Sequence, residues 1–226
     1  MSYVRDLIID ASSDYNDPIS FTGFVIDADG DGARITGADW IRFLNRALIA
    51  LINVRPDSYA IRLAHLLTAG VYQTVPDDCV KLMDVLRNLG AGGITDGPPI
   101  TKANKEDIEA IAPTWYSAAG VSGNITAYCY DERQPQQFLV YPRTLGAWYV
   151  EILYAASKSM VSYNELMPTR PNFDVPLVDY MLYSAYSIDE DSVQNRDLAI
   201  KYLNKFYSDL GISAQTQAMV GPKDEL

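Results

Sequence analysis

An acidic, glycine-containing segment near the amino terminus holds the residues best placed to do chemistry. Asp27, Asp29 and Asp31 stand at positions one, three and five, and Gly32 at position six, as in the calcium loop of an EF-hand. Carboxylates in this pattern are the oxygen ligands that a hard cation prefers. The match then fails, because position twelve requires a bidentate glutamate and holds Ala38. An acidic surface turn is therefore favoured, and Asp27, Asp29 and Asp31 remain only weak metal candidates.

The chain offers one further combination of reactive groups, the thiols of Cys79 and Cys129 with the single imidazole, His65. Neither cysteine lies in a recognisable nucleophile motif. Cys129 stands among strand-forming aromatic residues and is expected to be buried, Cys79 is expected in a turn, and His65 in a strand. The chain also has no phosphate-binding glycine loop, no serine-hydrolase elbow and no zinc spacing. The sequence therefore predicts no catalytic residue and no cofactor site.

The clearest structural element is a helix that begins near Trp40. Its apolar residues recur at steps of three and four, which places them on one stripe. Thr36 or Asp39 can cap its start, and Pro56 should end it at about Val54. The stripe consists of Trp40, Phe43, Leu44, Ala47, Leu48, Leu51 and Ile52.

Three more segments have helical periodicity. The first is a short helix with Val4, Leu7, Ile8 and Ala11 on one face. The second starts at Pro176 and covers residues 177–188, and the third covers residues 195–210 and stops before Gly211. The second and third of these, together with the Trp40 helix, predict a small antiparallel bundle.

Strand-forming residues fill the middle of the chain. Alternation over residues 58–75, interrupted by Ala69-Gly70, predicts a β-hairpin. Residues 82–89 suit either a helix or a strand, and we favour the strand. Three runs rich in β-branched and aromatic residues predict an antiparallel meander, and a short acidic helix is expected over residues 105–111. The three runs are residues 125–130, 138–141 and 148–155.

These elements predict an α+β fold in which a small helical bundle, built from the N- and C-terminal segments, lies beside a central antiparallel β-sheet lobe. We expect a single domain over residues 1–211. Its helical lobe comprises residues 1–57 and 176–211, its β lobe residues 58–157, and a crossing loop residues 158–175. Residues 212–226 lose the periodicity and are expected to form a C-terminal arm.

Composition limits the possible functions. The chain has 226 residues and 48% hydrophobic content, enough for a core without metal or disulfide support. A net charge of -11 opposes tight nucleic-acid binding. The same charge suits the wall of a channel through which DNA must slide, because such a wall does not hold phosphates. It suits an ordinary acidic protein equally well. No apolar run reaches the ~20 residues of a membrane span, and no secretion signal is recognised, so synthesis in the cytoplasm is expected.

Sixteen tyrosines are present, concentrated between Tyr128 and Tyr207. Most are expected on half-buried strand and helix faces. Tyrosine also suits interfaces, because it combines a large apolar ring with a polar tip.

The order of motifs along residues 1–211 resembles the head-to-tail adaptor proteins of short-tailed bacteriophages. It begins with an N-terminal helix and a W-x-x-x-L-N-R-A helix, Trp40 to Ala47, that ends in Arg55-Pro56-Asp57. The later motifs are Val75-Pro76-Asp77-Asp78, residues 82–90, Pro113-Thr114-Trp115, Tyr141-Pro142, residues 149–155 and Leu182-Tyr183-Ser184-Ala185-Tyr186.

The resemblance implies a structural virion protein at the head–tail junction, and not an enzyme. Copies of the chain, twelve by resemblance, would form a ring that joins the portal protein to tail nozzle or tail tube proteins. Packaged DNA would pass through without sequence-specific binding, and no membrane or cofactor would take part. Two alternatives stay open, a calcium-dependent binding module that uses the Asp27–Asp31 loop and a hydrolase. The arm would reach the portal, with candidate contacts at Ile212, Gln215, Gln217, Met219, Val220 and Leu226.

Overall fold

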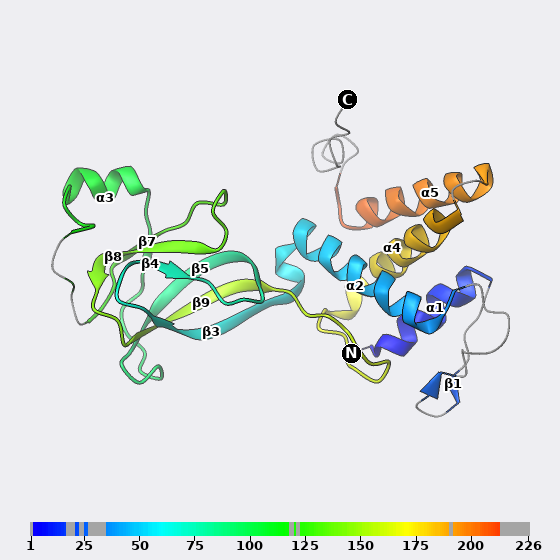
Figure 1. Ribbon diagram of the computed structural model, residues 1–226, viewed down its shortest axis with the longest axis horizontal. Helices are drawn as coiled ribbons and strands as arrows, with labels where there is room; N and C mark the ends of the chain where they lie inside the picture. Colours follow the sequence, from blue (N-terminus) through cyan, green and yellow to red (C-terminus); the bar gives the residue numbers. More distant parts are fainter. Residues whose placement is uncertain are drawn as a thin grey trace. The chain divides into compact units, whose positions relative to one another are not determined.

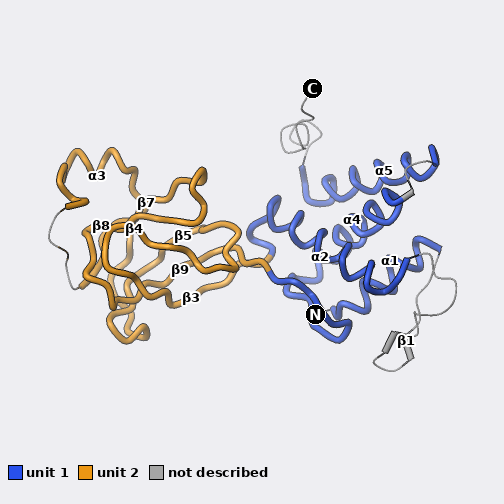
Figure 2. The backbone as a smooth tube through the Cα atoms, in the orientation of Figure 1, with its two compact units in different colours: residues 1–58, 158–226 blue, residues 59–157 orange. Residues whose placement is uncertain are grey.

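The computed structural model describes residues 2–16, 21–22, 25–26, 35–117, 120, 123–189 and 192–212. The chain divides into two compact units, a helical unit of residues 1–58 and 158–226 and a β unit of residues 59–157 (Figure 2). Helices and two sheets of three and four strands make this an α+β fold, as predicted. The two units are described separately below.

Four α-helices build the helical unit: α1 (Val4–Asp14), α2 (Gly37–Val54), α4 (Asp174–Tyr186) and α5 (Val193–Asp209) (Figure 1). Short 3₁₀ turns, η1 (Pro56–Tyr59), η2 (Pro171–Phe173) and η3 (Ser187–Asp189), flank α2 and α4. A short antiparallel pair, β1 (Phe21–Thr22) and β2 (Val25–Ile26), follows α1.

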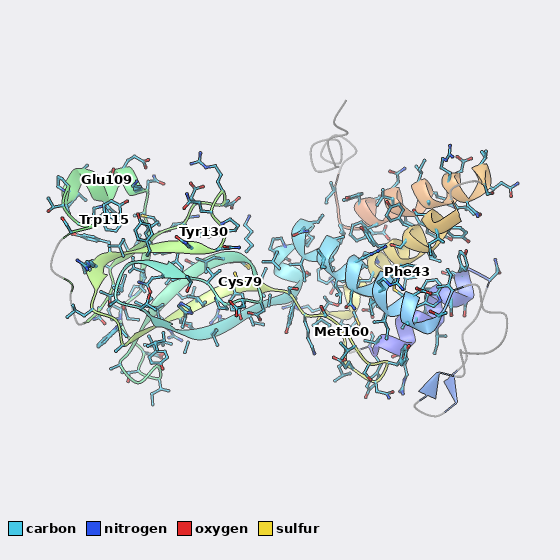
Figure 3. All side chains as sticks on the ribbon, viewed as in Figure 1. Phe43, Cys79, Glu109, Trp115, Tyr130 and Met160 are labelled. Carbon is cyan, nitrogen blue, oxygen red and sulfur yellow. The ribbon has the colours of Figure 1, made fainter. Side chains whose placement is uncertain are left out.

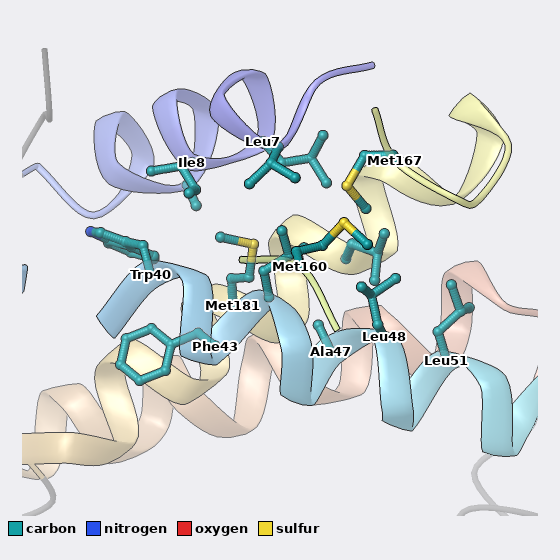
Figure 4. Packing of buried hydrophobic residues seen from close by; sticks show 14 of the residues in the cluster. Leu7, Ile8, Trp40, Phe43, Ala47, Leu48, Leu51, Met160, Met167 and Met181 are labelled. Atoms are coloured by element: carbon teal, nitrogen blue, oxygen red, sulfur yellow. The ribbon is translucent and has the colours of Figure 1, made fainter. Parts of the chain in front are cut away.

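Helix α2 has the boundaries that its sequence predicts. The Asp39 N–H donates to the Thr36 hydroxyl at 3.2 Å, and the Thr36 N–H donates to the Asp39 carboxylate at 3.2 Å. The two residues therefore form a capping box. The helix ends at Val54, two residues before Pro56. Its whole predicted stripe is buried, and Figure 4 shows residues of α1 and α2 facing each other across three methionines, Met160, Met167 and Met181.

Asn45 of α2 holds the segment that enters the helical unit from the β unit. Its side-chain amide donates to the Met160 carbonyl at 2.9 Å, and its side-chain oxygen accepts from the Met160 N–H at 2.7 Å. This pair of bonds gives an irregular segment a fixed position against α2, because both backbone groups of Met160 are satisfied there. Met160 is buried in the helical core as a result.

Helix α4 starts at Asp174, earlier than the predicted start at Pro176. The 3₁₀ turn η2 leads directly into α4, so helical geometry exists before the proline is reached. A proline is tolerated there because the N–H groups of the first helical turn have no acceptor within the helix, so a missing N–H breaks no helical hydrogen bond.

The β unit consists of two sheets. The first has the order β3 (Ala60–Leu67), β9 (Trp148–Ala156) and β5 (Cys79–Gly90). The second has the order β4 (Gly70–Thr74), β8 (Gln137–Thr144), β7 (Ala127–Cys129) and β6 (Thr101–Lys102). All neighbours are antiparallel except β6 and β7. Strand β5 confirms the preference for a strand over residues 82–89.

The predicted hairpin over residues 58–75 is wrong, since β3 pairs with β9 and β4 pairs with β8. The two pairs form one long antiparallel ribbon that passes from the first sheet to the second. One segment of the ribbon, β3 followed by β4, crosses between Leu67 and Gly70. The other segment, β8 followed by β9, crosses around Gly146. A Cβ at Gly146, whose φ is +87°, would lie 2.9 Å from the Ala69 nitrogen. Alternation identifies a strand face but does not select the partner strand.

The predicted meander is half correct for the same reason. Strands β7 and β8 pair as expected, whereas β8 and β9 belong to different sheets. Both sheets contribute to one apolar core, which includes Val85, Phe138 and Ile152. Helix α3 (Lys105–Ile111), at the predicted position, covers a smaller cluster of Val71, Ile108, Trp115 and Cys129.

Candidate assembly surfaces

Helix α5 ends in a defined cap at its last described residues. The Ile212 N–H donates to the Tyr207 carbonyl at 3.0 Å, and the Gly211 N–H donates to the Ser208 carbonyl at 2.9 Å. With Gly211 at φ +75°, these bonds form a Schellman cap. Ile212 packs, half-buried, against the helical core. The direction in which the chain leaves α5 is therefore set by defined hydrogen bonds.

Replacing Gly211 with alanine should lower the free energy of unfolding of the helical unit by about 1 kcal/mol, because an L-residue with a Cβ is strained at positive φ. Open space surrounds the site of the added Cβ, so a clash does not contribute. Urea denaturation followed by circular dichroism measures the change. Gly211→Asn should lose less, since asparagine tolerates this conformation. Equal losses in both variants would contradict the assignment to backbone strain.

The other five predicted arm contacts lie outside the described residues: Gln215, Gln217, Met219, Val220 and Leu226. The calcium-loop candidates Asp27, Asp29 and Asp31 also lie outside them. Within the part of the chain that the structure describes, no group of three or more His, Cys, Asp or Glu side chains is arranged to hold a metal ion.

The cysteines and the histidine lie in environments that keep them uncharged. Burial, assisted by the charge of Asp78, raises the pKa of Cys79 to about 11. Burial also raises the pKa of Cys129 and lowers the pKa of His65, whose ring lies 6.0 Å from that of Phe138. Cys79 (Figure 3) is the first residue of β5, so its predicted place in a turn is wrong by one position. A nucleophilic thiol requires the thiolate, which these environments disfavour.

The tyrosines of the helical unit join its helices. Tyr15, the residue directly after α1, contacts Tyr186 of α4 with ring centroids 4.9 Å apart. Tyr186 stacks on Tyr202 of α5, with ring centroids 5.7 Å apart. Tyr15 also meets the edge of Trp40 at 6.0 Å. These rings are half-buried, as predicted for most tyrosines, and their contacts stabilise the bundle.

A second aromatic group lines an open cleft of about 650 Å³ in the β unit. Tyr72, 59% exposed on the edge strand β4, stacks on Tyr116 with ring centroids 6.2 Å apart. The Lys105 ammonium lies 5.6 Å from the Tyr116 ring centroid, and Tyr130 and Arg133 line the same cleft (Figure 3 labels Tyr130). Sequence reasoning missed this surface, because its residues come from separate segments without a common motif.

The motif residues at the end of α2 have a structural role. Arg55 donates from Nε and one terminal nitrogen to the two Asp57 carboxylate oxygens, each at 2.9 Å. The Arg55 hydrogen bond holds the pKa of Asp57 below its usual range. The Arg55 guanidinium also lies 5.9 Å from the Phe173 ring centroid, so the motif ties the turn after α2 to the start of α4.

The comparison with protein families gives the class of protein. No described helix has the length and apolar character that crossing a membrane requires. No curated protein matches the chain. The family model for SU10 adaptor proteins matches residues 2–223. That family consists of structural phage adaptors and not of enzymes, which supports a place at the head–tail junction of a virion. The chain belongs to the SU10 adaptor protein family.

Proposed function

We propose that copies of this chain form a ring at the head–tail junction of a short-tailed phage, between the portal and the tail nozzle or tail tube. The observation that carries the proposal is the family match over residues 2–223. The match includes the helical unit, the β unit and most of the C-terminal arm. A ring of twelve copies, with a central path for DNA, is the arrangement that the resemblance implies.

The surfaces described above suit an assembly subunit. In the proposed ring, residues 1–211 act as one adaptor domain and the arm from Ile212 reaches the portal. The Schellman cap supports this role, because it gives the arm a fixed origin on a packed helix. The loops and the Tyr72–Tyr116 cleft of the β unit are available for tail components.

The charge of the chain is compatible with a DNA path. At -11 per copy, the ring would carry a strongly negative field. Such a wall does not hold phosphates, because attraction to DNA requires clustered Lys and Arg side chains. The proposal therefore includes passage of DNA without sequence-specific binding.

Removing the arm should abolish portal binding while the helical unit stays folded. Truncation after Ile212 is the sharpest design, since it keeps both hydrogen bonds of the cap. Sedimentation velocity of the protein mixed with the portal ring should show a complex for the full chain and none for the truncated one. Absence of a complex in this measurement means a dissociation constant at least tenfold higher, which corresponds to a loss of at least about 1.4 kcal/mol of binding free energy.

A matched control keeps Ile212 in place and scrambles the order of the fourteen residues after it, 213–226, so length, composition and charge do not change. The scrambled arm should also fail to bind the portal. Portal binding by the truncated protein, equal to that of the full chain, would remove the arm from the proposal. Portal binding by the scrambled arm would show that its sequence does not matter.

A further inference from the structure

Strand β3 leaves one edge of the first sheet without a partner. It is the outermost strand in the order β3, β9, β5, and within the described part of the chain no strand pairs with its second side (Figure 1). All eight residues of β3 pair with β9 in one continuous register, and none is a proline. The free N–H and C=O groups of such an edge can bind a further extended strand.

The other edges of the two sheets are protected. Residues 98–100 run along the outer side of β5, where the Ile100 N–H donates to the Leu86 carbonyl at 3.0 Å. Strand β6 has only two residues, and the register of β4 is irregular between Gly70 and Tyr72. Covering segments, short strands and bulges are common means of preventing strand addition. Among the described residues, none of these features protects β3.

Apolar side chains are exposed on both faces of β3. Ile61 and Leu67 face the core of the β unit, and Leu63 belongs to the same face because side chains alternate along a strand. Leu63 is nevertheless 41% exposed, whereas Ile152, which lies opposite it on β9, is 0% exposed. On the other face, Leu66 is 47% exposed. The core is therefore partly uncovered along this edge, and a strand added to β3 would cover it.

The charge of this edge indicates what kind of strand it accepts. The chain has a net charge of -11, yet it has no carboxylate between Asp57 and Asp77, and Arg62 is the only Lys, Arg, Asp or Glu in β3. Two copies of an acidic chain repel each other least where carboxylates are absent. One arginine is too little to hold a nucleic acid, and a basic peptide would find no carboxylate to bind. The edge fits another apolar strand with little charge, and the β3 strand of a second copy has these properties.

One antiparallel register suits these side chains. With Ala64 opposite Ala64 of the second copy, Arg62 lies opposite Leu66 of that copy, and Leu63 lies opposite its His65. The aliphatic stem of Arg62 can then cover the exposed leucine, while its charged end stays in water. The two arginines are separated by about 13 Å along the strands, because four residues lie between their positions.

We propose that two copies of the free chain associate through β3, paired antiparallel about a two-fold axis at Ala64. The two three-stranded sheets then form one continuous sheet, and neither β3 edge stays open. A two-fold contact of this kind is closed, so it gives a dimer and not a ring. The dimer protects an aggregation-prone edge of the chain before assembly. This inference does not rest on the proposed function.

Sedimentation velocity of the full chain over a wide range of concentrations tests the proposal. The unmodified protein should change from monomer to dimer as its concentration rises. Leu66→Lys places an ammonium group opposite Arg62 of the second copy at two symmetric positions, so the dissociation constant should rise about tenfold. Leu66→Glu should keep or strengthen the dimer, because the new carboxylate meets Arg62.

The charge of the whole chain predicts the opposite order for these two variants, since lysine reduces the net negative charge and glutamate increases it. Circular dichroism should show that both variants remain folded, because Leu66 is exposed in the single chain. An unmodified protein that stays monomeric at every concentration would overturn the proposal. So would a dimer that Leu66→Glu weakens as much as Leu66→Lys does.

Cysteine cross-linking tests the register. Ala64→Cys should give a disulfide-linked dimer on mild oxidation, because directly opposite residues have Cα atoms about 4.5 to 5.5 Å apart, within the range of a disulfide. Ala60→Cys is the matched control, since it changes another exposed alanine on the same face of β3. Its two copies would lie about 27 Å apart along the strands and should not cross-link.

The unmodified chain, which contains Cys79 and Cys129, gives the background of this measurement. Cross-linking of Ala64→Cys above that background, without cross-linking of Ala60→Cys, supports the register. Equal cross-linking of the two variants, or cross-linking of neither, would overturn the proposed pairing.

Discussion

Replacing Asn88 with alanine is expected to lower the free energy of unfolding of the β unit by about 3 to 5 kcal/mol, the range for leaving several buried polar groups without partners. Asn88 lies in β5 and is 0% exposed. Its side-chain amide donates to the carbonyls of Pro98 at 3.0 Å and of Ile125 at 2.8 Å, and its oxygen accepts from the Ile125 N–H at 2.8 Å. Alanine cannot replace these bonds.

Two further variants make this expectation specific. Asn88→Asp keeps the size and the acceptor but loses both donors, so it should also destabilise strongly. Asn124→Ala changes an exposed asparagine beside the same segment and should alter stability by less than about 0.5 kcal/mol. Urea denaturation monitored by circular dichroism measures all three. A loss below about 1 kcal/mol for Asn88→Ala would contradict the bonding described for this side chain.

Replacing Trp40 with alanine should destabilise the helical unit by about 3 to 5 kcal/mol, as expected for a large aromatic residue removed from a packed core. Trp40 is 0% exposed and meets Phe43 edge-on, with ring centroids 5.7 Å apart. It also contacts Tyr15, the residue directly after α1 (Figure 4 shows Trp40 on α2, on the side that faces α1). The substitution would leave a cavity between two helices that cannot close without moving both.

Trp40→Phe is the matched control. The indole N–H of Trp40 has no hydrogen-bond partner among the described residues, so phenylalanine removes volume without breaking a bond. It should therefore cost about half as much as alanine. Both variants remove a tryptophan, which alters the change in fluorescence on unfolding. Unfolding is therefore followed by far-ultraviolet circular dichroism. Equal losses for the two variants would indicate that ring packing at this position is unimportant.

The helices could be predicted from the sequence because residues close to each helix end determine where the helix starts and stops. Thr36 and Asp39 form the capping box of α2, and Pro56 excludes its continuation. Gly211 gives α5 its C-terminal cap in the same local manner. The α+β class follows from these helices and from the strand-forming middle of the chain.

The pairing of strands could not be predicted in the same way. The break at Ala69-Gly70 has the composition of a hairpin turn, yet the chain crosses there into the second sheet. At this point the chain lies against the segment around Gly146, which joins β8 to β9 and is far away in sequence. A hydrophobic alternation carries no information about such a distant segment.

The candidate sites were also predictable only in part. The end of α5 before Gly211 follows from the loss of periodicity there and from the glycine itself. By contrast, Asn88 is a polar residue in a half-buried strand, where it is indistinguishable in sequence from an exposed one. The Tyr72–Tyr116 cleft draws on separate segments, and no local spacing indicates that they meet there.

Electron microscopy of the purified full chain with and without the portal ring tests the proposed assembly most directly. The proposal predicts a second ring stacked on one face of the portal, with a continuous central opening and density from each subunit that reaches the portal. The same preparation of the chain truncated after Ile212 should show bare portals. Subunits that stay separate and leave the portal bare, even when the chain is present in excess over the portal, would contradict the proposed assembly.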